Sequence, residues 1–292
     1  INGGQALQII AGGTTDLQLV GNSTPLTSLD VDSTGTLTLI GNISTDGAAG
    51  VALDGSADVD LAAGVTIDTS AGGGLIDLTG GAVDGAQNLV LTSGGGNMNL
   101  GPLGQNIAFA SLDVNSSGTV NLSGNIDTDG GNMDFSGAGT VELDASVTLT
   151  TSSAGNIDLG STNATTVTDS GAFGLTLDSV GTISTDEVTV DTLTITNGTN
   201  LTLYGNLEAT AGDIDFSGLT DGDSIDLSTA AATITASGNV ATVGENINGG
   251  QALQIIAGGT TDLQLVGNST PLTSLDVDST GTLTLIGNIS TD

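Results

Sequence analysis

Carboxylates are almost the only ionisable side chains in this sequence. The 292 residues include 33 Asp and Glu but no Lys, Arg, His or Cys, which gives a formal net charge of −33. Catalytic triads that need His or Lys, thiol chemistry and lyase mechanisms that use Arg or Lys are therefore excluded. Two kinds of carboxylate chemistry remain, namely glycoside hydrolysis by a pair of acids and coordination of a hard cation.

Calcium coordination is the stronger of these two hypotheses. Hard cations bind several carboxylate and carbonyl oxygens, and two short stretches are dense in Asp. The sequence matches neither the DxDxDG start of an EF-hand loop nor the GGxGxDxUx nonapeptide. No cofactor is required by any motif, and the predicted calcium ligands are Asp54, Asp58, Asp60, Asp221, Asp223 and Asp226.

A glycosidase built from the same carboxylates is the weaker hypothesis. Asp58 and Asp60, or the three acids Asp221, Asp223 and Asp226, have the spacing of a solvated strand face. A sugar-binding site also needs aromatic side chains, and the chain has only four Phe, one Tyr and no Trp. We therefore predict that the protein is not an enzyme and has no catalytic residues.

The elements that position these acids are short β-strands. Apolar residues recur with period 2, and Gly, Ser, Asn and Asp form turn signals between them, while helical periodicity is missing. Thr pairs such as Thr36/Thr38 also alternate, a pattern that suits an ordinary outward strand face better than an ice-binding surface. The clearest apolar pairs are Leu29/Val31, Leu37/Leu39, Val51/Leu53, Val59/Leu61, Val65/Ile67, Ile76/Leu78, Leu89/Leu91, Met98/Leu100 and Ile107/Phe109.

The strands belong to a repeated sequence. Leu29, Leu112, Leu193 and Leu275 each begin a related stretch, at intervals of 83, 81 and 82 residues. Residues 1–46 and 247–292 are identical, which defines a longer repeat of 246 residues. We expect super-repeat units at about 29–111, 112–192 and 193–274, with 247–292 restarting the long repeat, and we read the chain as a window on a longer protein.

Strands of three or four residues are too short to be stable as isolated hairpins. They become stable when the chain coils and each strand stacks on the strand one coil earlier, as in a parallel β-helix. The sequence therefore predicts an all-β solenoid that runs without interruption over residues 1–292, with three short strands in each coil of about 20 residues.

The acidic surface restricts the partners. A chain without basic residues repels nucleic acid and anionic membranes, and no apolar run is long enough to span a bilayer as a helix. We therefore expect neither nucleic-acid binding nor membrane insertion. The expected partners are neighbouring repeats of the same long chain and laterally associated identical rods.

Three segments carry a family resemblance: 22–31 (NSTPLTSLDV), 35–47 (GTLTLIGNISTDG) and 83–100 (VDGAQNLVLTSGGGNMNL). They resemble the β-strand repeats of very large bacterial surface proteins of the filamentous haemagglutinin type. That resemblance implies a right-handed parallel β-helix, the shaft of an extracellular or cell-surface fibre, and a glycan or protein receptor. The predicted function is thus a structural shaft of a filament or giant adhesin, and the alternative is a calcium-dependent adhesive or ligand-binding module.

Overall fold

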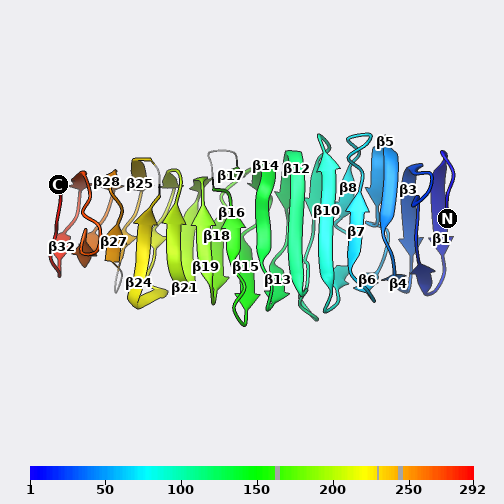
Figure 1. The fold of residues 1–292 in the computed structure, drawn as a ribbon, viewed down its shortest axis with the longest axis horizontal. Coiled ribbons are helices and arrows are strands. Elements are labelled where there is room, and N and C mark those ends of the chain that lie inside the picture. The colour runs from blue at the N-terminus through cyan, green and yellow to red at the C-terminus, as the bar shows by residue number, and fades with distance from the viewer. Residues whose placement is uncertain (162–164, 229, 243–245) are drawn as a thin grey trace. The chain divides into compact units, whose positions relative to one another are not determined.

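The protein is all β. The structure, a computed structural model, describes residues 1–161, 165–228, 230–242 and 246–292, and within strand β24 it leaves the side chains of residues 220 and 221 undescribed. The described residues form β-strands, turns and loops, and they contain no helix (Figure 1). The chain divides into two compact units, unit 1 over Ile1–Glu142 and unit 2 over Leu143–Asp292.

Unit 1 consists of parallel strands, of which the last ends one residue beyond the unit. Its strands are β1 (Ala6–Ala11), β2 (Thr15–Leu17), β3 (Leu26–Ser33), β4 (Thr36–Leu39), β5 (Ile43–Ala52), β6 (Asp58–Leu61), β7 (Val65–Asp68), β8 (Ile76–Leu78), β9 (Ala82–Asp84), β10 (Asn88–Gly94), β11 (Met98–Leu100), β12 (Ser111–Leu122), β13 (Ile126–Asp129) and β14 (Met133–Leu143).

Unit 2 repeats this arrangement, again with parallel pairing between strands one coil apart. Its strands are β15 (Val147–Ser152), β16 (Ile157–Leu159), β17 (Thr166–Asp169), β18 (Gly174–Ser179), β19 (Thr182–Thr185), β20 (Glu187–Val190), β21 (Thr192–Leu203), β22 (Leu207–Ala209), β23 (Ile214–Asp215), β24 (Leu219–Leu227), β25 (Ala232–Ala236), β26 (Val240–Ala241), β27 (Asn246–Asn248), β28 (Ala252–Ala257), β29 (Thr261–Leu263), β30 (Leu265–Val266), β31 (Ser274–Ser279) and β32 (Leu283–Leu285).

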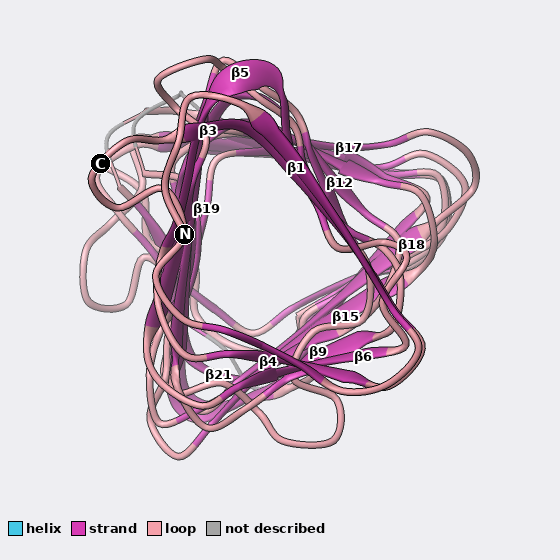
Figure 2. Cartoon of the chain, turned by 90° about the vertical axis from the view of Figure 1, so that its right-hand side faces the viewer, coloured by secondary structure: helices cyan, strands magenta, loops and turns pink. Residues whose placement is uncertain are grey.

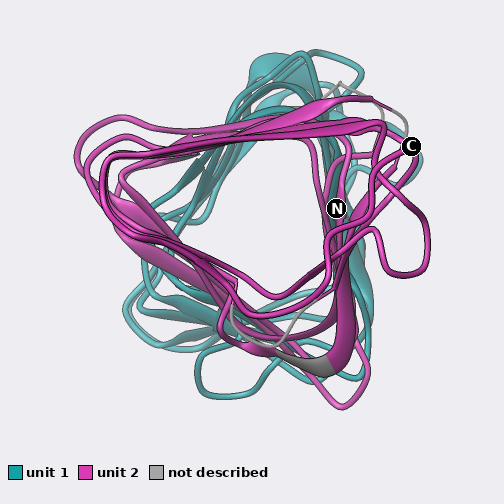
Figure 3. Ribbon diagram, turned by 90° about the vertical axis from the view of Figure 1, so that its left-hand side faces the viewer, with its two compact units in different colours: residues 1–142 teal, residues 143–292 magenta. Residues whose placement is uncertain are grey.

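Strands β6 to β11 show how one coil stacks on the next. Strand β6 pairs with β9, β7 with β10 and β8 with β11, always in parallel. The three strands of a coil lie on three sides of a triangle, which is visible in each unit when it is viewed along the stacking direction (Figures 2 and 3). The predicted parallel β-solenoid with three strands per coil is therefore confirmed.

The coils vary in length more than the sequence predicted. Leu7 lies beside Leu29, 22 residues further along, and this spacing is close to the expected 20. In unit 2, however, Gly174 lies beside Thr192, 18 residues on, while Val147 lies beside Leu175, 28 residues on. Parallel pairing is kept in both cases, although the register of β18 and β21 shifts between Leu177 and Asp178. Coil length can vary because the entropic cost of closing a loop grows slowly with its length.

The core is a stack of alternate aliphatic side chains. In β7 the sequence VTID has Val65 and Ile67 buried, while the intervening residues lie partly in solvent. Ile67 stacks between Ile43 of the preceding coil and Leu91 of the following one. Each Å² of apolar surface that such a column removes from water stabilises the fold by about 25 cal/mol. Burial of these side chains is therefore the main favourable contribution to the free energy of folding.

Eight of the nine predicted apolar pairs are buried at both positions, and Ile107/Phe109 is the exception. Phe109 is fully buried and forms an isolated bridge with Thr128, but Ile107 is exposed, and the pair lies in no strand. The backbone N–H groups of Asn106 and Ile107 both donate to the carboxylate of Asp84, at 2.9 and 3.2 Å. This bonding holds residues 106–107 in a bend, which does not follow the side-chain alternation of a strand.

Several strands are longer than expected because they continue around a corner of the triangle. Leu112 and Val114, in the first half of β12, pair with β10, whereas Val120 and Leu122 in its second half pair with β11. The change of partner falls between Ser116 and Val120, and the small residues Ser117 and Gly118 lie in this interval. Such residues are typical of turns and would be expected to end a strand, but strand β12 continues through them.

Candidate functional site

Three of the predicted calcium ligands lie near one another in sequence in unit 1. Asp58 and Asp60 are on β6, where they alternate with the buried residues Val59 and Leu61, and both are exposed. Asp54 is also exposed, and it lies in the turn between β5 and β6. In the following coil Asp60 has Asp84 as its register partner, so the strand pairing brings two acids side by side.

The other predicted ligands lie on β24 of unit 2. Asp223 and Asp226 are half-buried, and Asp226 accepts a 2.7 Å hydrogen bond from the Ser224 hydroxyl. The side chain of Asp221 lies outside the described part of the structure. No group of three or more acids in the described ranges is arranged to hold a metal ion, and calcium binding at these six residues stays a prediction.

The expectation that Asp58 and Asp60 are not a glycosidase pair stays a prediction. Residues two apart on a strand are separated by about 6.6 Å, and both carboxylates face solvent from one strand face. Phe109, Phe135 and Phe216 are fully buried, so these rings cannot stack on a sugar. Thr residues do not line one face coil after coil, as an ice-binding surface would require. Thr38, for example, has Asp16 as its register partner in the preceding coil and Asp60 in the following one.

The most enclosed acid in unit 1 is Asp84, which the sequence reasoning missed. Asp84 as a whole is 5% exposed, and its carboxylate accepts hydrogen bonds from two backbone N–H groups and from the Asn106 amide. Asn2 and Asn248 accept equivalent backbone bonds, from Ser23 at 2.9 Å and from Ser269 at 3.0 Å. A recurring motif was the available signal: Asn-Gly-Gly-Gln at 2–5 and 248–251, and Asp-Gly-Ala-Gln at 84–87.

A second recurring feature is a set of buried hydroxyl groups at one corner of unit 1. Thr69 donates to the carbonyl of Gly74 at 2.6 Å, and Ser93 and Ser116 both donate to that of Gly96, at 2.6 and 2.8 Å. These side chains are buried and face carbonyl groups that the turns leave outside the strand ladders. They fix the turns to the core, and this role is structural.

Residues on the outer face of β8, β11 and β12 form a polar ladder. The Asn99 amide donates to the carboxylate of Asp77 at 3.0 Å, and the Asn121 amide donates to Asn99 at 2.9 Å. Asp77, Asn99 and Asn121 are register partners in three successive coils. The ladder therefore links coils from the outside, in parallel with the aliphatic columns inside.

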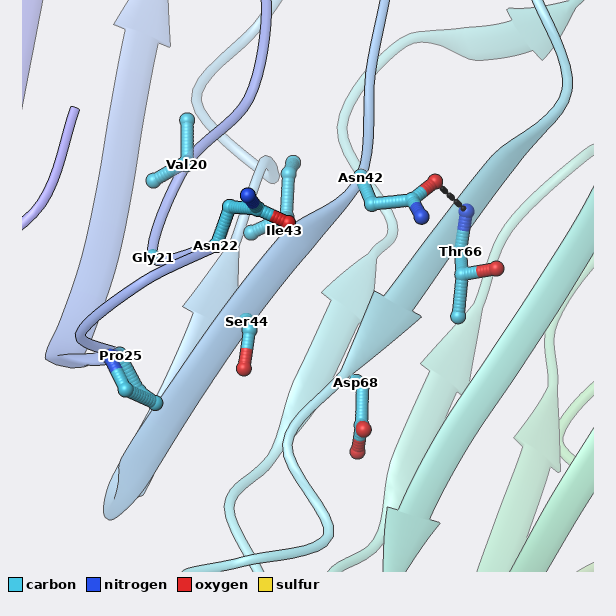
Figure 4. Close-up of a pocket in the computed structure, with 9 residues that line it drawn as sticks. All are labelled: Val20, Gly21, Asn22, Pro25, Asn42, Ile43, Ser44, Thr66 and Asp68. Carbon is cyan, nitrogen blue, oxygen red and sulfur yellow. Dashed lines mark hydrogen bonds between the residues drawn. The ribbon is translucent and has the colours of Figure 1, made fainter.

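A shallow hollow of about 220 Å³ lies on the surface of unit 1 (Figure 4). Its polar groups already take part in bonds between coils, because Asn42 accepts from the Thr66 N–H at 2.9 Å. The space can hold a few water molecules, and it offers no aromatic or basic group for a larger ligand. It is lined by Val20, Gly21, Asn22, Pro25, Asn42, Ile43, Ser44, Thr66 and Asp68.

Asp113 on β12 has an environment that disfavours its charge. Partial burial raises the pKa of the Asp113 carboxyl above its ordinary value. A 2.8 Å hydrogen bond from the Asn115 amide lowers this pKa, while the nearby charge of Asp134 raises it. The ionised form of Asp113 is therefore destabilised, as expected where stacked coils bring acids together without basic partners.

The chain matches no known protein family, no curated protein and no solved structure. Across the described ranges, no helix has the length and apolar character needed to cross a membrane. The assignment of function therefore depends on the geometry of the coils and on their surface chemistry.

Proposed function

We propose that this protein is a structural repeat module, the shaft of an extracellular or cell-surface filament or giant adhesin. The observation that carries the proposal is the parallel stacking of coils. Ile43, Ile67, Leu91 and Val114 are register partners in four successive coils, and each lies in the core. A fold built this way lengthens by adding coils, which suits a spacer better than a catalyst.

The mechanical part of the proposal follows from the direction of the hydrogen bonds. Backbone bonds of a parallel ladder run from coil to coil, as between the Ser44 N–H and the Val20 carbonyl at 2.9 Å. Three ladders carry such bonds in each coil, so a pull along the stacking direction is shared among many bonds. The outer ladder of Asp77, Asn99 and Asn121 adds side-chain bonds in the same direction.

The acidic exterior supports the extracellular part of the proposal, because such a surface suits surroundings rich in salt and divalent cations. With 33 acids and no basic side chain, the charge is balanced only by ions from solution. Such a surface stays soluble and avoids nucleic acid and anionic lipid. The resemblance of segments such as 83–100 to filamentous haemagglutinin-type repeats supports the adhesin form of the proposal, with lateral rods and a glycan or protein receptor as partners.

Small-angle X-ray scattering tests the shaft proposal. A chain extended by one further 246-residue repeat should increase the maximum dimension in proportion to the added coils while the cross-sectional radius of gyration stays constant. The 292-residue chain is the matched control. A compact particle whose radius of gyration scales as the cube root of mass would overturn the proposal.

The alternative function is a calcium-dependent adhesive or ligand-binding module. The proximity of Asp60 and Asp84 in register favours it, because adjacent carboxylates repel unless a cation lies between them. Thermal unfolding in millimolar calcium and in chelator tests this, with Asp58→Asn/Asp60→Asn as the variant. If the alternative is right, calcium raises the unfolding midpoint of the wild type but not that of the variant. Equal midpoints in all samples would rule out the alternative.

A further inference from the structure

Three Asn-Gly dipeptides occur in the sequence, at Asn2, Asn197 and Asn248. The glycine that follows each asparagine has no Cβ, so its backbone nitrogen can approach the side-chain carbonyl carbon of the asparagine closely. Attack by that nitrogen converts asparagine to aspartate through a cyclic imide. The structure places the three dipeptides in different environments, and these environments decide where the reaction can occur.

Two of these asparagines are held by the following coil. Asn248 is 6% exposed, and its side-chain oxygen accepts hydrogen bonds from the backbone N–H groups of Ser269 and Thr270, at 3.0 and 3.4 Å. Asn2 accepts the two equivalent bonds, at 2.9 and 3.4 Å. Each side-chain carbonyl is bonded to the next coil, so it must give up these bonds before it can turn to its own glycine.

Asn197 is held by no such bonds. It lies on β21 with its side chain exposed, and within the described ranges this side chain forms no hydrogen bond. The register of β21 with β18 shifts between Leu177 and Asp178, and its register with β24 shifts between Gly198 and Asn200. Because the pairing is irregular on both sides, the backbone at this point is freer to rotate than in a regular ladder.

We propose that Asn197 is a modification site, at which the folded chain converts its own side chain to a carboxylate. The reaction is an intramolecular acyl transfer followed by hydrolysis, and it needs only water and hydroxide. The proposal goes beyond the shaft function, because it concerns a covalent change in the chain and not the stacking of its coils.

The reaction begins at the backbone nitrogen of Gly198. Hydroxide removes the proton of this N–H group, and the nitrogen attacks Cγ of Asn197. The N–Cγ bond forms, the bond from Cγ to Nδ2 breaks, and Nδ2 leaves as ammonia after taking a proton from water, which regenerates hydroxide. Water then opens the cyclic imide. Cleavage between the nitrogen and Cγ gives aspartate, cleavage between the nitrogen and the main-chain carbonyl carbon gives isoaspartate, and nothing is oxidised or reduced.

The product places a new charge beside an existing one. Asp178 is the register partner of Asn197 in the preceding coil, and the chain has no Lys, Arg or His to neutralise a second carboxylate there. Adjacent carboxylates repel, so the neutral amide suits this position better than the product does. Isoaspartate also adds a carbon atom to the backbone, which shifts the following residues of β21 out of register. Conversion of Asn197 therefore weakens the contact between β18 and β21.

Peptide mapping of the aged full chain tests the site. The folded protein and a sample unfolded in urea are incubated in the same mildly alkaline buffer. An endoproteinase that cleaves before Asp replaces trypsin, because the chain has no Lys or Arg. Conversion of Asn197 to aspartate creates a new cleavage point within the peptide 191–212, and an isoaspartyl methyltransferase detects isoaspartate. Asn197→Gln removes the site, because glutamine would need a larger ring, and Asn22→Gln at another exposed position is the matched control.

The rates at the three dipeptides give the result. In the folded chain Asn197 should convert more than about tenfold faster than Asn2 or Asn248, because only Asn197 reacts without local opening of the structure. In urea the three should convert at similar rates. The proposal is overturned if Asn197 stays intact in the folded protein, or if Asn248 converts there as fast as Asn197.

The unfolding midpoint tests the consequence of the modification. Asn197→Asp should lower the midpoint, and Asn197→Asp/Asp178→Asn should restore it, because only one carboxylate then remains in the pair. Asn22→Asp adds the same charge at an exposed loop position and is the control. A double variant that stays as unstable as Asn197→Asp would overturn the assigned repulsion by Asp178.

Discussion

The side-chain amide of Asn121 donates a 2.9 Å hydrogen bond to the amide oxygen of Asn99, one coil earlier and on the same face of unit 1. Asn99 in turn donates to Asp77 at 3.0 Å. The Asn99 amide therefore donates to one coil and accepts from the next, so a neutral side chain links stacked coils where two acids would repel.

Replacing the middle residue of this ladder should expose that repulsion. Asn99→Asp removes the donor to Asp77 and places two carboxylates in adjacent coils, which should lower the free energy of unfolding by about 1–2 kcal/mol at pH 7. The loss should shrink as the pH falls and the new carboxyl is protonated. Urea unfolding at pH 7 and pH 3 measures both effects, and Asn22→Asp adds the same charge at an exposed position. An equal loss at both pH values would contradict this explanation.

A buried hydroxyl without a partner offers a stabilising substitution. The Thr45 hydroxyl is fully buried and makes no hydrogen bond, so Thr45→Val should raise the free energy of unfolding by about 1 kcal/mol. Thr69 is equally buried but donates to the Gly74 carbonyl, so Thr69→Val should lower it by about 1–3 kcal/mol. Denaturant unfolding of the two variants measures the contrast, and a change of the same sign in both would argue against it.

A recurring glycine marks a corner that cannot accept a side chain. Gly104 has φ +70°, and a Cβ there would lie 2.3 Å from the Asp127 carbonyl oxygen; Gly21 and Gly267 share this geometry. Gly104→Ala should cost at least about 2 kcal/mol, because it combines left-handed strain with a backbone clash. Gly64→Ala is the control, since its Cβ would meet nothing closer than 3.8 Å. Thermal unfolding compares the two variants. Equal midpoints would refute the claim that position 104 cannot accept a side chain.

Asp113 should make stability depend on pH in a defined direction. Because burial raises the pKa of the folded carboxyl above its ordinary 3.8, the folded state holds this proton more tightly than the unfolded state does. The contribution is present below pH 3.8 and is lost as the pH rises through the folded pKa. Asp113→Asn should therefore raise the unfolding midpoint at pH 7 and leave it unchanged near pH 3. Asp16→Asn, at an exposed position, is the control, and the opposite pH trend would exclude the interpretation.

The sequence predicted the parts of the fold that repeat. Alternate residues such as Val65 and Ile67 are core because a strand buries every second side chain, and the stacked coils follow from strands too short to stand alone. Ser and Gly residues such as those at 116–118 are typical of turns, whereas β12 passes through them, because pairing with two neighbouring strands compensates for their weak strand propensity. An uninterrupted solenoid over 292 residues stays a prediction, since the structure describes two units.

The candidate site was less accessible to sequence reasoning. Exposed acids such as Asp58 look the same in sequence whether they bind calcium or only solvent. Asp84 differs from them because a loop one coil later folds over it, and no local pattern reports that contact. Comparison of the repeats was the only available signal, since Asn2, Asp84 and Asn248 hold one position of the motif.

Cysteine cross-linking tests the parallel stacking of coils most directly, because the chain has no cysteine of its own. Thr38 and Asp60 are register partners in successive coils, so their Cα atoms should lie about 4.8 Å apart, within disulfide range. The variant Thr38→Cys/Asp60→Cys should form an intramolecular disulfide under mild oxidation. Thr38→Cys/Asp58→Cys is shifted by two residues, to about 8 Å, and should not form one. Failure of the first pair, or equal reaction of both pairs, would contradict the stacked-coil structure.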